Sequence, residues 1–499
     1  MALIGLDVGG TGVKAVAFGR GGAILSSSYR EYDMIQDHPG WYELEPAQIF
    51  EAARGVLKEA AGACPEEVFG IGVSSFGESF VCLDENDNII SRSIMYLDNR
   101  GEEYVREMTE KLDLEAFRLR TGTVPRNLQS IYKMRVLEQY HPGTLARTKK
   151  IHFIADFILS RLGGGHFTDY GLAATTGAFD LSTKTWINDM FEWAGLDPAV
   201  LPKPIAAGAC FGHLTRAAAE DLGLKEGIVL VSGGHDHVPS SLGSGVYRAG
   251  TAMNAIGTVD TFMIITDDAD TMLHYNGNYG FKNHLLPGNY QVMPSGNLTG
   301  GVLLKWFRDH IGKYEKAMWA KEGLDFYSEY EKQMPQKPTD LLVLPRFGGY
   351  GTTFADRAGI LNLTLSTTNE EIYRAFMESE TYEMYTSLKD YMDQNKLLSG
   401  ITAVNGGANC NTYMQIRADI YNIPVTTVNC PQPGALGDAM LAGIAAGIYK
   451  DANEAVADCV AIRRVFEPNA ENHAYYMEMY DKYRKIYDFM RSIECKAQA

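Results

Sequence analysis

The sequence predicts an α/β fold divided into two domains, and three observations support this prediction. The chain has 499 residues, whereas a single hydrophobic core stops growing at about 250–300 residues. Short apolar runs rich in β-forming residues alternate with amphipathic helical patterns, which is typical of layered α/β architectures. The same alternation starts again near residue 250, after a cluster of glycine and serine residues at 243–250. We therefore expect one domain over residues 1–247 and another over residues 248–499.

The first half begins with three predicted strands joined by tight turns. Glycines at residues 9–10 and 19–22 punctuate the β-rich runs, as glycines do in turns between strands. These runs are residues 3–8, 13–18 and 23–29. Because the turns are short, we expect an antiparallel meander. Helices are then predicted at residues 46–61 and 101–112, with an apolar strand at 69–75 between them.

The second half repeats the alternation of strands and helices. Two apolar runs with a short break between them predict strands at residues 252–258 and 261–266. Longer stretches with helical periodicity follow. They predict helices at residues 301–310, 370–394 and 414–421.

The composition indicates a folded protein that binds a small molecule. Hydrophobic residues make up 45% and charged residues 21% of the chain, as in globular proteins. The formal net charge of −17 argues against a nucleic-acid partner, because phosphate backbones are bound by Lys and Arg. No stretch approaches the ~20 apolar residues of a membrane-spanning helix. The seven cysteines show no pairing pattern or metal-ligand spacing, so we expect a cytoplasmic protein with reduced thiols.

Residues 7–14, Asp-Val-Gly-Gly-Thr-Gly-Val-Lys, lie between two predicted strands. Glycines let backbone N–H groups approach phosphate oxygens, while Thr11 adds a hydroxyl donor and Lys14 a positive charge. Asp7 supplies a carboxylate suited to Mg²⁺. The segment is not a Walker loop, and it is not a dinucleotide fingerprint because a strand rather than a helix follows. A plain glycine-rich hairpin turn explains this segment equally well when it is taken alone.

A second apolar strand, at residues 228–232, runs into Gly-Gly-His-Asp-His. A carboxylate at a strand end can accept the proton of an attacking hydroxyl and hold that hydroxyl in line with a phosphoryl group. Asp236 is therefore the candidate base. The alternative is a metal site made by His235, Asp236 and His237. This alternative is the weaker one, because adjacent strand residues point to opposite faces and no third ligand is evident.

Two further glycine-containing turns lie in the second half. Gly257 and Thr258 follow a predicted strand and could form a second phosphate turn. Residues 404–411, Val-Asn-Gly-Gly-Ala-Asn-Cys-Asn, lie at a strand-to-helix junction, where glycines allow a flat adenine ring to lie against the backbone. Each segment alone is explained as well by an ordinary turn. Their order along the chain is the stronger signal.

Taken in order, these motifs resemble the FGGY family of carbohydrate kinases, which includes xylulokinase, gluconokinase, fuculokinase and glycerol kinase. The resemblance extends over nearly the whole chain. The other matching segments are residues 39–43 with Pro46, 96–100, 154–158, 168–169, 201–202, 306–309, 344–345 and 433–439. The resemblance implies the actin-hexokinase fold, with two ribonuclease-H-like domains around a central cleft. It also implies an ATP-dependent reaction with Mg²⁺.

The resemblance further implies roles for individual residues. Asp236 would be the catalytic base, and Asp7 would lie near Mg²⁺. The residues expected to bind ATP are Gly9, Gly10, Thr11, Lys14, Gly257, Thr258, Gly301, Lys305, Gly406 and Gly407, with Asn409 or Asn411. The residues expected to bind the substrate are Glu78, Asp98, Arg100, His237 and Trp41. For Trp41, packing of a surface aromatic is an equally good interpretation.

The resemblance leaves the substrate open. Residues 75–77, Ser-Phe-Gly, and 234–237, Gly-His-Asp-His, depart from the sequences typical of xylulokinases at positions expected to contact the sugar. The prediction is phosphorylation of a small-sugar hydroxyl, with a ketopentose first and a deoxyketohexose, polyol or aldonate as alternatives. The non-enzymatic alternative is an actin-like, nucleotide-gated assembly module, against which the polar residues of the substrate side argue. A homodimer is expected from the family alone.

Overall fold

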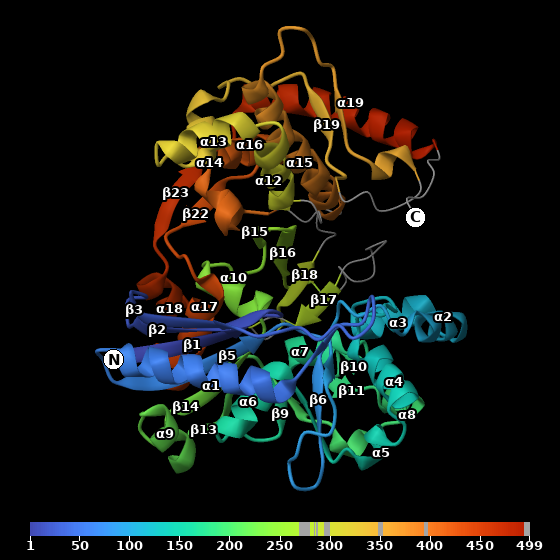
Figure 1. Ribbon diagram of the computed structural model, residues 1–499, viewed down its shortest axis with the longest axis vertical. Coiled ribbons are helices and arrows are strands. Elements are labelled where there is room, and N and C mark those ends of the chain that lie inside the picture. The colour runs from blue at the N-terminus through green and yellow to red at the C-terminus, as the bar shows by residue number, and fades with distance from the viewer. Residues whose placement is uncertain are drawn as a thin grey trace. The chain divides into compact units, whose positions relative to one another are not determined.

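The computed structural model describes residues 1–268, 280–283, 285, 288–293, 300–347, 353–393 and 398–493. The chain forms two compact units (Figure 1). The first unit consists of Met1–Ala249, Ile265–Val292 and Cys430–Ala461. The second unit consists of Gly250–Ile264, Met293–Asn429 and Ile462–Ala499. The division into residues 1–247 and 248–499 stays a prediction about domains, and the compact units differ from it because two later segments pack with the first unit.

The first unit is built on a six-stranded sheet with the strand order β13-β14-β5-β1-β2-β3 among the described residues. These strands are β1 (Ala2–Val8), β2 (Gly12–Gly19), β3 (Ile24–Glu31), β5 (Val68–Ser75), β13 (Cys210–His213) and β14 (Val229–His235). The antiparallel pairing of β1 with β2 and of β2 with β3 confirms the predicted meander. The pairings of β1 with β5 and of β5 with β14 are parallel.

Helices cover both faces of this sheet (Figure 1). Helices α1 (Pro46–Ala63) and α6 (Ile154–Leu162) lie on one face, and α10 (His237–Gly243) and α17 (Pro433–Ala445) lie on the other. Helix α17 approaches the strands so closely that a Cβ atom on Gly5 would lie 1.8 Å from the Ala435 carbonyl oxygen. A Cβ on Gly72 would likewise lie 2.1 Å from the Asp438 carbonyl oxygen. This glycine-lined contact is the physical reason why the segment Cys430–Ala461 belongs to the first unit.

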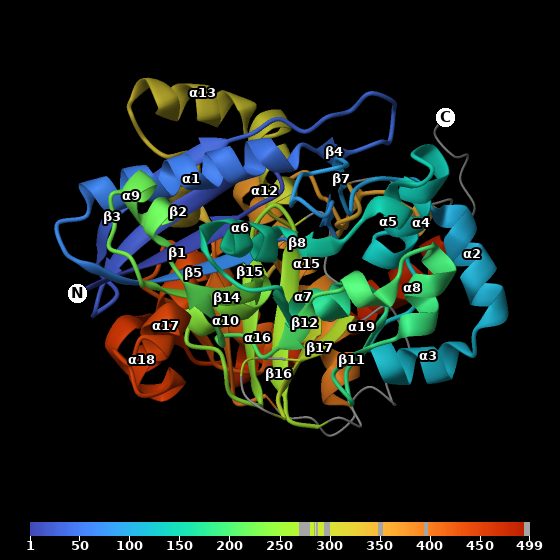
Figure 2. The same ribbon diagram turned by 90° about the horizontal axis from the view of Figure 1, so that it is seen from below.

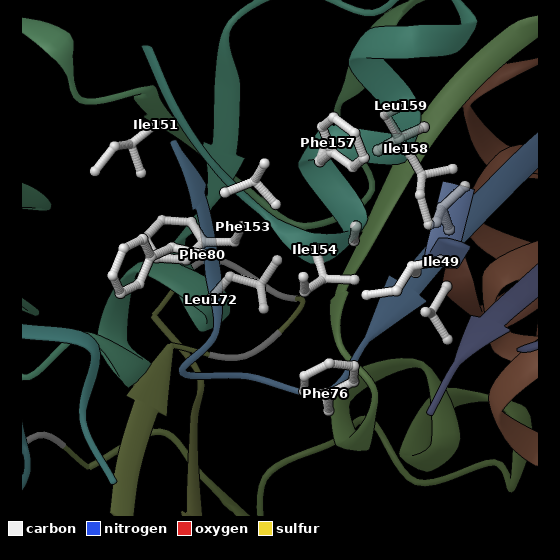
Figure 3. Packing of buried hydrophobic residues seen from close by; sticks show 14 of the residues in the cluster. Ile49, Phe76, Phe80, Ile151, Phe153, Ile154, Phe157, Ile158, Leu159 and Leu172 are labelled. Carbon is white, nitrogen blue, oxygen red and sulfur yellow. The ribbon is translucent and has the colours of Figure 1, made fainter. Parts of the chain in front are cut away.

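The main hydrophobic core of the first unit lies between the sheet and the helices on the α1 face. Ile49 of α1 and Ile154 and Ile158 of α6 are almost fully buried in it (Figure 3). Strands β6 (Phe80–Leu83) and β8 (Lys150–Phe153) pair antiparallel, and β8 leads directly into α6. Ile151 and Phe153 of β8 point their side chains into the same core (Figure 3).

Smaller elements complete the first unit. Helices α2, α3, α4, α5 and α8 gather at one side of it (Figures 1 and 2). The elements wholly or mainly in this unit are β4 (Glu43–Leu44), β7 (Ser93–Ile94), α2 (Glu102–Lys111), α3 (Leu114–Thr121), α4 (Ser130–Tyr140), α5 (Thr144–Arg147), β9 (Phe167–Asp169), α7 (Tyr170–Thr175), β10 (Phe179–Asp180), β11 (Thr185–Trp186), α8 (Asn188–Ala194), η1 (Pro198–Val200), β12 (Lys203–Ile205), α9 (Arg216–Leu222), β17 (Gly280–Asn283), β18 (Tyr290–Met293) and α18 (Ala452–Cys459).

The second unit contains neighbouring strands in the order β16-β15-β21-β22-β23. They are β15 (Thr251–Ile256), β16 (Asp260–Thr266), β21 (Gly400–Val404), β22 (Val425–Val428) and β23 (Ile462–Phe466). Strands β15, β21 and β22 run parallel, and β23 is antiparallel to β22. The other elements are α12 (Gly300–His310), α13 (Lys313–Lys321), α14 (Phe326–Gln333), β19 (Leu342–Leu344), η2 (Phe354–Asp356), β20 (Gly359–Leu361), α15 (Asn369–Met392), η3 (Gly406–Asn409), α16 (Asn411–Tyr421) and α19 (Ala470–Arg491).

The predicted elements of the second half are present with shifted ends. The helices predicted at 301–310, 370–394 and 414–421 correspond to α12, α15 and α16, although residue 394 lies outside the described residues. The strand predicted to reach residue 258 ends at Ile256, because Gly257 opens a turn whose N–H donates to the Val259 carbonyl oxygen at 3.1 Å. Among the described residues, no helix is both long enough and apolar enough to cross a membrane.

Candidate functional site

The carboxyl ends of three strands meet at one edge of the first sheet. Strands β1, β5 and β14 are parallel neighbours, so their carboxyl ends lie on the same side. In the register, Asp7 lies beside Ser74, and Ser74 lies beside Gly234. The predicted phosphate turn and the predicted base therefore lie at the same edge, separated by the width of β5.

The turn between β1 and β2 brings together the predicted residues at 7–14. Asp7 and Lys14 are direct cross-strand partners, and Gly9, Gly10 and Thr11 lie in or beside the connecting turn. The Gly9 N–H donates to the Gly12 carbonyl oxygen at 2.9 Å, and the Tyr32 hydroxyl donates to the Gly9 carbonyl oxygen. These bonds fix the turn. The Lys14 ammonium donates to Gln432 Oε1 at 3.1 Å, which ties it to the segment that precedes α17.

Asp236 lies where the chain leaves β14 and enters α10. Its backbone is already helical, with φ −48° and ψ −27°, and its N–H donates to the Ser75 carbonyl oxygen at 3.0 Å. Asp236 Oδ1 lies 3.3 Å from His235 Nδ1 and 3.8 Å from His237 Nε2. The argument that these side chains point to opposite faces is therefore wrong. The strand ends at His235, so the alternation ends there too, and the three potential ligand atoms lie within 4.8 Å of one another.

A third carboxylate, Asp438 of α17, belongs to this edge and was not predicted. It is fully buried, and its Oδ2 accepts a hydrogen bond from Ser74 Oγ at 2.6 Å. Its Oδ1 is buried without a hydrogen-bond partner among the described residues. Burial, followed by the charges of Asp7 and Asp236, raises the pKa of Asp438 well above its usual value. The chain segment 433–439 was recognised in the sequence, but its packing against β5 could not be.

The acidic edge fits a divalent cation. Burial, and then the nearby charge of Asp236, raises the pKa of Asp7 to about 7, although Lys14 partly opposes the shift. Carboxylates raise one another's pKa when too little positive charge nearby offsets their repulsion. Oxygen donors of this kind are the ligands that Mg²⁺ prefers. Asp7 therefore remains the residue proposed to lie near the metal, with Asp236 and Asp438 close by.

Glu78 approaches the same edge from the loop after β5. Its backbone has a φ of 67°, a left-handed conformation that is uncommon for a residue with a side chain. The Glu78 N–H donates to Thr175 Oγ1 at 3.0 Å, and its carbonyl oxygen accepts from Ser130 Oγ at 2.6 Å. A Cβ on Gly77 would lie 2.8 Å from His235 Cδ2, so this loop runs against the base segment. Strain of this kind is held at functional sites by surrounding contacts.

Tyr96 is a second residue at this edge that the sequence did not single out. Burial and then the charges of Asp236 and Glu78 raise the pKa of its hydroxyl. A Cβ on Gly10 would lie 3.8 Å from that hydroxyl. Tyr96 therefore lies close to the phosphate turn, and its hydroxyl is influenced by the charges of Asp236 and Glu78. The only signal in the sequence was its place at the start of the segment 96–100.

Asp98 and Arg100 are buried, and the half-buried Trp41 packs against Arg100. The Arg100 guanidinium donates to both Asp98 carboxylate oxygens, at 2.9 and 2.7 Å, and to Glu43 Oε1 at 2.7 Å. Asp98 Oδ2 also accepts from the Tyr42 N–H at 2.8 Å. The Arg100 guanidinium stacks 4.1 Å from the Trp41 ring. These contacts occupy most of the polar groups of Asp98 and Arg100, so the structure favours a role in supporting the surrounding fold. Substrate binding by Asp98, Arg100 and Trp41 stays a prediction.

The second unit contains a pocket of about 590 Å³, a volume typical of small-molecule sites. It is lined by Gly257, Thr258, Gly301, Lys305, Gly406, Gly407 and Asn409 of the predicted nucleotide residues. Asn411 is exposed at the start of α16 and does not line the pocket. The geometry therefore favours Asn409 over Asn411 as the asparagine that faces a ligand.

Two glycines of this pocket lie too close to neighbouring atoms to carry a side chain. A Cβ on Gly407 would lie 2.2 Å from Ile256 Cγ2, and a Cβ on Gly301 would lie 2.5 Å from the Gly257 carbonyl oxygen. The Gly301 N–H donates to that same oxygen at 2.8 Å. Arg463 holds the turn η3, because its guanidinium donates to Asn409 Oδ1 at 2.9 Å and to the Ala408 carbonyl oxygen. The two predicted turns of this half, together with Gly301 at the start of α12, thus form one wall.

The other wall was missed by the sequence analysis. It is formed by helices α14, α15 and α16 and includes Asp325, Tyr327, Ser328, Glu331, Tyr373, Met377 and Tyr413. Aromatic and thioether side chains at helical spacing look like ordinary core residues in a sequence. The folded chain alone shows that they border a pocket.

A buried ion pair holds the pocket's two walls in place. Arg417 of α16 pairs with Asp260 at the start of β16, and both side chains are fully buried. Arg417 also donates to Asn254 Oδ1 and to the Tyr413 hydroxyl, each at 2.5 Å. Asp260 directly follows the turn 257–259, while Tyr413 lines the pocket. The network therefore connects the glycine wall to the helical wall.

Comparison with known proteins agrees with this geometry. Residues 2–243 match the FGGY family of carbohydrate kinases, N-terminal domain, and residues 252–446 match its C-terminal domain. The chain belongs to the FGGY family of carbohydrate kinases. It is therefore a phosphotransferase with the mixed α/β, actin-like fold of these enzymes, which confirms the predicted fold and class of activity.

Relatives of this carbohydrate kinase differ in their named substrates. A xylulose kinase from Bacillus subtilis (strain 168) is 25% identical over 503 residues, which cover 98% of this chain and 97% of that protein. A gluconokinase from Bacillus licheniformis is 26% identical, with 99% of each chain covered. The crystal structure of xylulose kinase from Rhodospirillum rubrum superposes with a TM-score of 0.86 over 99% of each chain, at 24% identity. The last likeness shows the shared fold.

Proposed function

We propose that this kinase transfers the γ-phosphoryl group of ATP to a hydroxyl of a small sugar, with a ketopentose as the first candidate. The observation that supports this most is the acidic edge of the first sheet. There Asp236 directly follows the buried strand β14, at the same sheet edge as Asp7, Asp438 and the phosphate-type turn between β1 and β2. A carboxylate next to a glycine turn suits a hydroxyl acceptor next to phosphate oxygens.

We assign the parts of the nucleotide to the residues that fit them. The adenosine part is assigned to the pocket of the second unit, where glycines leave room for a flat ring and Tyr327, Tyr373 and Tyr413 add aromatic surface. The phosphates are assigned to Gly9, Gly10, Thr11 and Lys14, and to the turn with Gly257 and Thr258. Gly301 and Lys305 border the nucleotide, while Gly406, Gly407 and Asn409 contact adenosine.

A Mg²⁺ ion fits beside Asp7, since the mutual repulsion of Asp7, Asp236 and Asp438 would be relieved by a positive charge. When bound, Mg²⁺ neutralises charge on the phosphate oxygens. The buried Ser74 hydroxyl, which donates to Asp438 Oδ2 at 2.6 Å, holds one of these carboxylates in a fixed position. The metal assignment rests on this set of oxygen donors.

Asp236 positions the acceptor hydroxyl and takes its proton. The sugar oxygen forms a bond to the γ-phosphorus, the bond from that phosphorus to the β,γ-bridging oxygen breaks, and ADP leaves. The hydroxyl proton goes to the Asp236 carboxylate. Because the transition state is loose, most of the acceleration comes from alignment and electrostatics. His237 and Glu78 are the side chains proposed to contact the other sugar hydroxyls, since each buried hydroxyl needs a partner.

The choice of a ketopentose rests on the xylulose kinase relative, and the gluconokinase relative keeps an aldonate as the main alternative. A deoxyketohexose and a polyol remain further alternatives. The site offers both a carboxylate, Glu78, and an imidazole, His237, on the predicted sugar side. A carboxylate facing the sugar disfavours an anionic substrate, which favours a neutral ketose over an aldonate.

An acceptor screen tests this proposal. ADP release is measured with saturating MgATP and equal concentrations of xylulose, fuculose, glycerol or gluconate, with an acceptor-free reaction as the control. The expected result is the highest kcat/KM for xylulose and almost no ADP release without an acceptor. A higher kcat/KM for gluconate would overturn the ketopentose assignment. ADP release that no acceptor stimulates would overturn the proposed reaction.

A further inference from the structure

The first unit contains a polar hollow on the face of strand β8 that points away from the core. The alternation of side chains along β8 sends Ile151 and Phe153 into the core (Figure 3) and puts Lys150 and His152 on the opposite face. Both line a polar hollow of about 140 Å³, together with Arg161 and His166. This volume is several times the roughly 10–15 Å³ that one water molecule needs. None of its lining residues belongs to the acidic edge or to the pocket of the second unit.

The polar groups of this hollow are mostly hydrogen-bond donors or cations. Lys150 pairs with Asp87 at 2.8 Å, and the Arg161 guanidinium donates to the Asp87 carbonyl oxygen at 2.6 Å. Asp87 is the one carboxylate among the described lining residues. No described carboxylate forms an ion pair with Arg161. The hollow therefore carries an excess of positive charge in a protein whose net charge is −17.

His152 provides an independent observation. It is only 2% exposed, yet its Nδ1 is buried without a hydrogen-bond partner among the described residues. An unsatisfied buried polar atom is costly and calls for an explanation such as a ligand. The neighbouring His166 ring lies 4.8 Å away and bonds through Nε2 to the Ile151 carbonyl oxygen at 2.9 Å. Because that acceptor requires a proton on Nε2, Nδ1 of a neutral His166 can accept but not donate.

We propose that this hollow binds a small tetrahedral oxyanion, such as phosphate, either free or carried as a phosphomonoester. Lys150 and Arg161 supply the attraction, and the His152 ring supplies a buried polar contact. Lys150 and Arg161 outweigh the single carboxylate Asp87, and this net positive charge opposes a metal cation at the same place. Arg and Lys are the side chains that recognise phosphate, the former through several donors and the latter as a point charge. The anion would bind to residues of β8 and α6, outside the residues assigned to ATP.

Inorganic phosphate is the probe, and its binding to the full-length protein is measured by titration calorimetry. Phosphate can also bind to the residues assigned to ATP phosphates, so the experiment uses a Lys14→Met background. In this background we expect one phosphate per chain. Lys150→Met and His152→Gln should each weaken binding tenfold or more. Lys149→Met removes the same charge one residue earlier, from an exposed side chain that does not line the hollow, and should bind as the parent does.

The outcomes separate this proposal from the kinase assignment. Absence of phosphate binding in the Lys14→Met protein, or equal losses for Lys149→Met and Lys150→Met, would overturn it. Thermal unfolding of each variant checks that the protein still folds, and His152→Gln then serves if Lys150→Met fails to fold. Competition by sulfate identifies a site for free anions, whereas stronger competition by glycerol phosphate identifies a site for phosphomonoesters. None of these outcomes decides whether the protein phosphorylates a sugar with ATP, which the acceptor screen tests.

Discussion

The acidic edge of the first unit and the pocket of the second unit differ in how the sequence forms them. The acidic edge takes Asp7, Lys14 and Asp236 from two short segments at strand ends. The pocket is lined by five separate stretches, from the turn after β15 to the start of α16. The first region therefore depends on charges placed by a few tight turns. The second depends on shape, which glycines and a buried ion pair maintain.

This difference predicts different consequences of substitution in the two regions. A change of charge at the acidic edge should alter the chemistry while the fold persists. The fold there is stabilised by helices that pack on the sheet through close glycine contacts. A change of shape in the pocket should alter stability or nucleotide affinity first. The experiments below test that contrast in order of expected effect.

Asp236→Asn should give the largest loss. Replacing the carboxylate by an amide removes the proton acceptor but keeps the size of the side chain, and general bases contribute about 10²–10⁴-fold. We expect kcat to fall about 10³-fold or more, while ADP affinity changes little. Steady-state kinetics and ADP titration measure the two quantities. Asp236→Glu, which keeps the charge, is the matched control. Near-normal turnover of Asp236→Asn would remove this residue from its role.

Asp260→Asn should give the largest loss of stability. The substitution leaves the Arg417 guanidinium fully buried without its carboxylate partner. Breaking a buried ion pair in this way costs about 3–5 kcal/mol of unfolding free energy. Urea unfolding measures it, with the exposed Asp340→Asn as the control, which should change stability by less than about 0.5 kcal/mol. The double variant Asp260→Leu/Arg417→Met should lose less than Asp260→Asn. Equal losses for Asp260→Asn and Asp340→Asn would contradict the role of this pair.

The same contrast explains what the sequence could predict. Gly257, Thr258, Gly406 and Gly407 stood out because glycines at strand ends mark special backbone geometry, and all four line the pocket. Asp438 was part of a recognised segment, but its place beside Ser74 depends on α17 packing against strand β5, more than 350 residues earlier in the chain. No local pattern reports such a contact. The alternation argument failed at His235 because it assumed that the strand continued by two residues.

Asp7 makes the stability of the first unit depend on pH. Its folded-state pKa of about 7 lies above the value of about 3.9 in an unfolded chain, so the folded protein holds the proton more tightly. Its stabilising contribution is therefore complete below about pH 4 and is lost as pH rises to 7. The side chain is half-buried, and we expect a loss of about 2–4 kcal/mol. Asp7→Asn should remove this dependence.

The measurement compares the unfolding free energies of the wild type and Asp7→Asn between pH 5 and 8 without divalent ions. The variant should become the more stable protein as pH rises. Saturating Mg²⁺ should reduce the difference at pH 8, since a bound cation favours the ionised carboxylate. Asp33→Asn, an exposed residue of the same unit, should run parallel to the wild type. If the unfolding free energy of Asp7→Asn changes with pH as that of the wild type does, ionisation of Asp7 does not destabilise the folded protein.

Gly407→Ala should weaken nucleotide binding while leaving the acidic edge intact. The added methyl group would lie 2.2 Å from Ile256 Cγ2, so either the turn η3 or strand β15 must move away from the pocket. We expect ADP affinity to fall about tenfold, equal to about 1.4 kcal/mol, with kcat at saturating ATP changed less. Gly359 of the same unit provides a control, because it does not line the pocket and a Cβ there would meet only Leu344 Cδ1, at 3.9 Å. Titration calorimetry of ADP with both variants should therefore show a loss for Gly407→Ala and almost none for Gly359→Ala. If both lose affinity equally, the loss does not depend on the contact with Ile256.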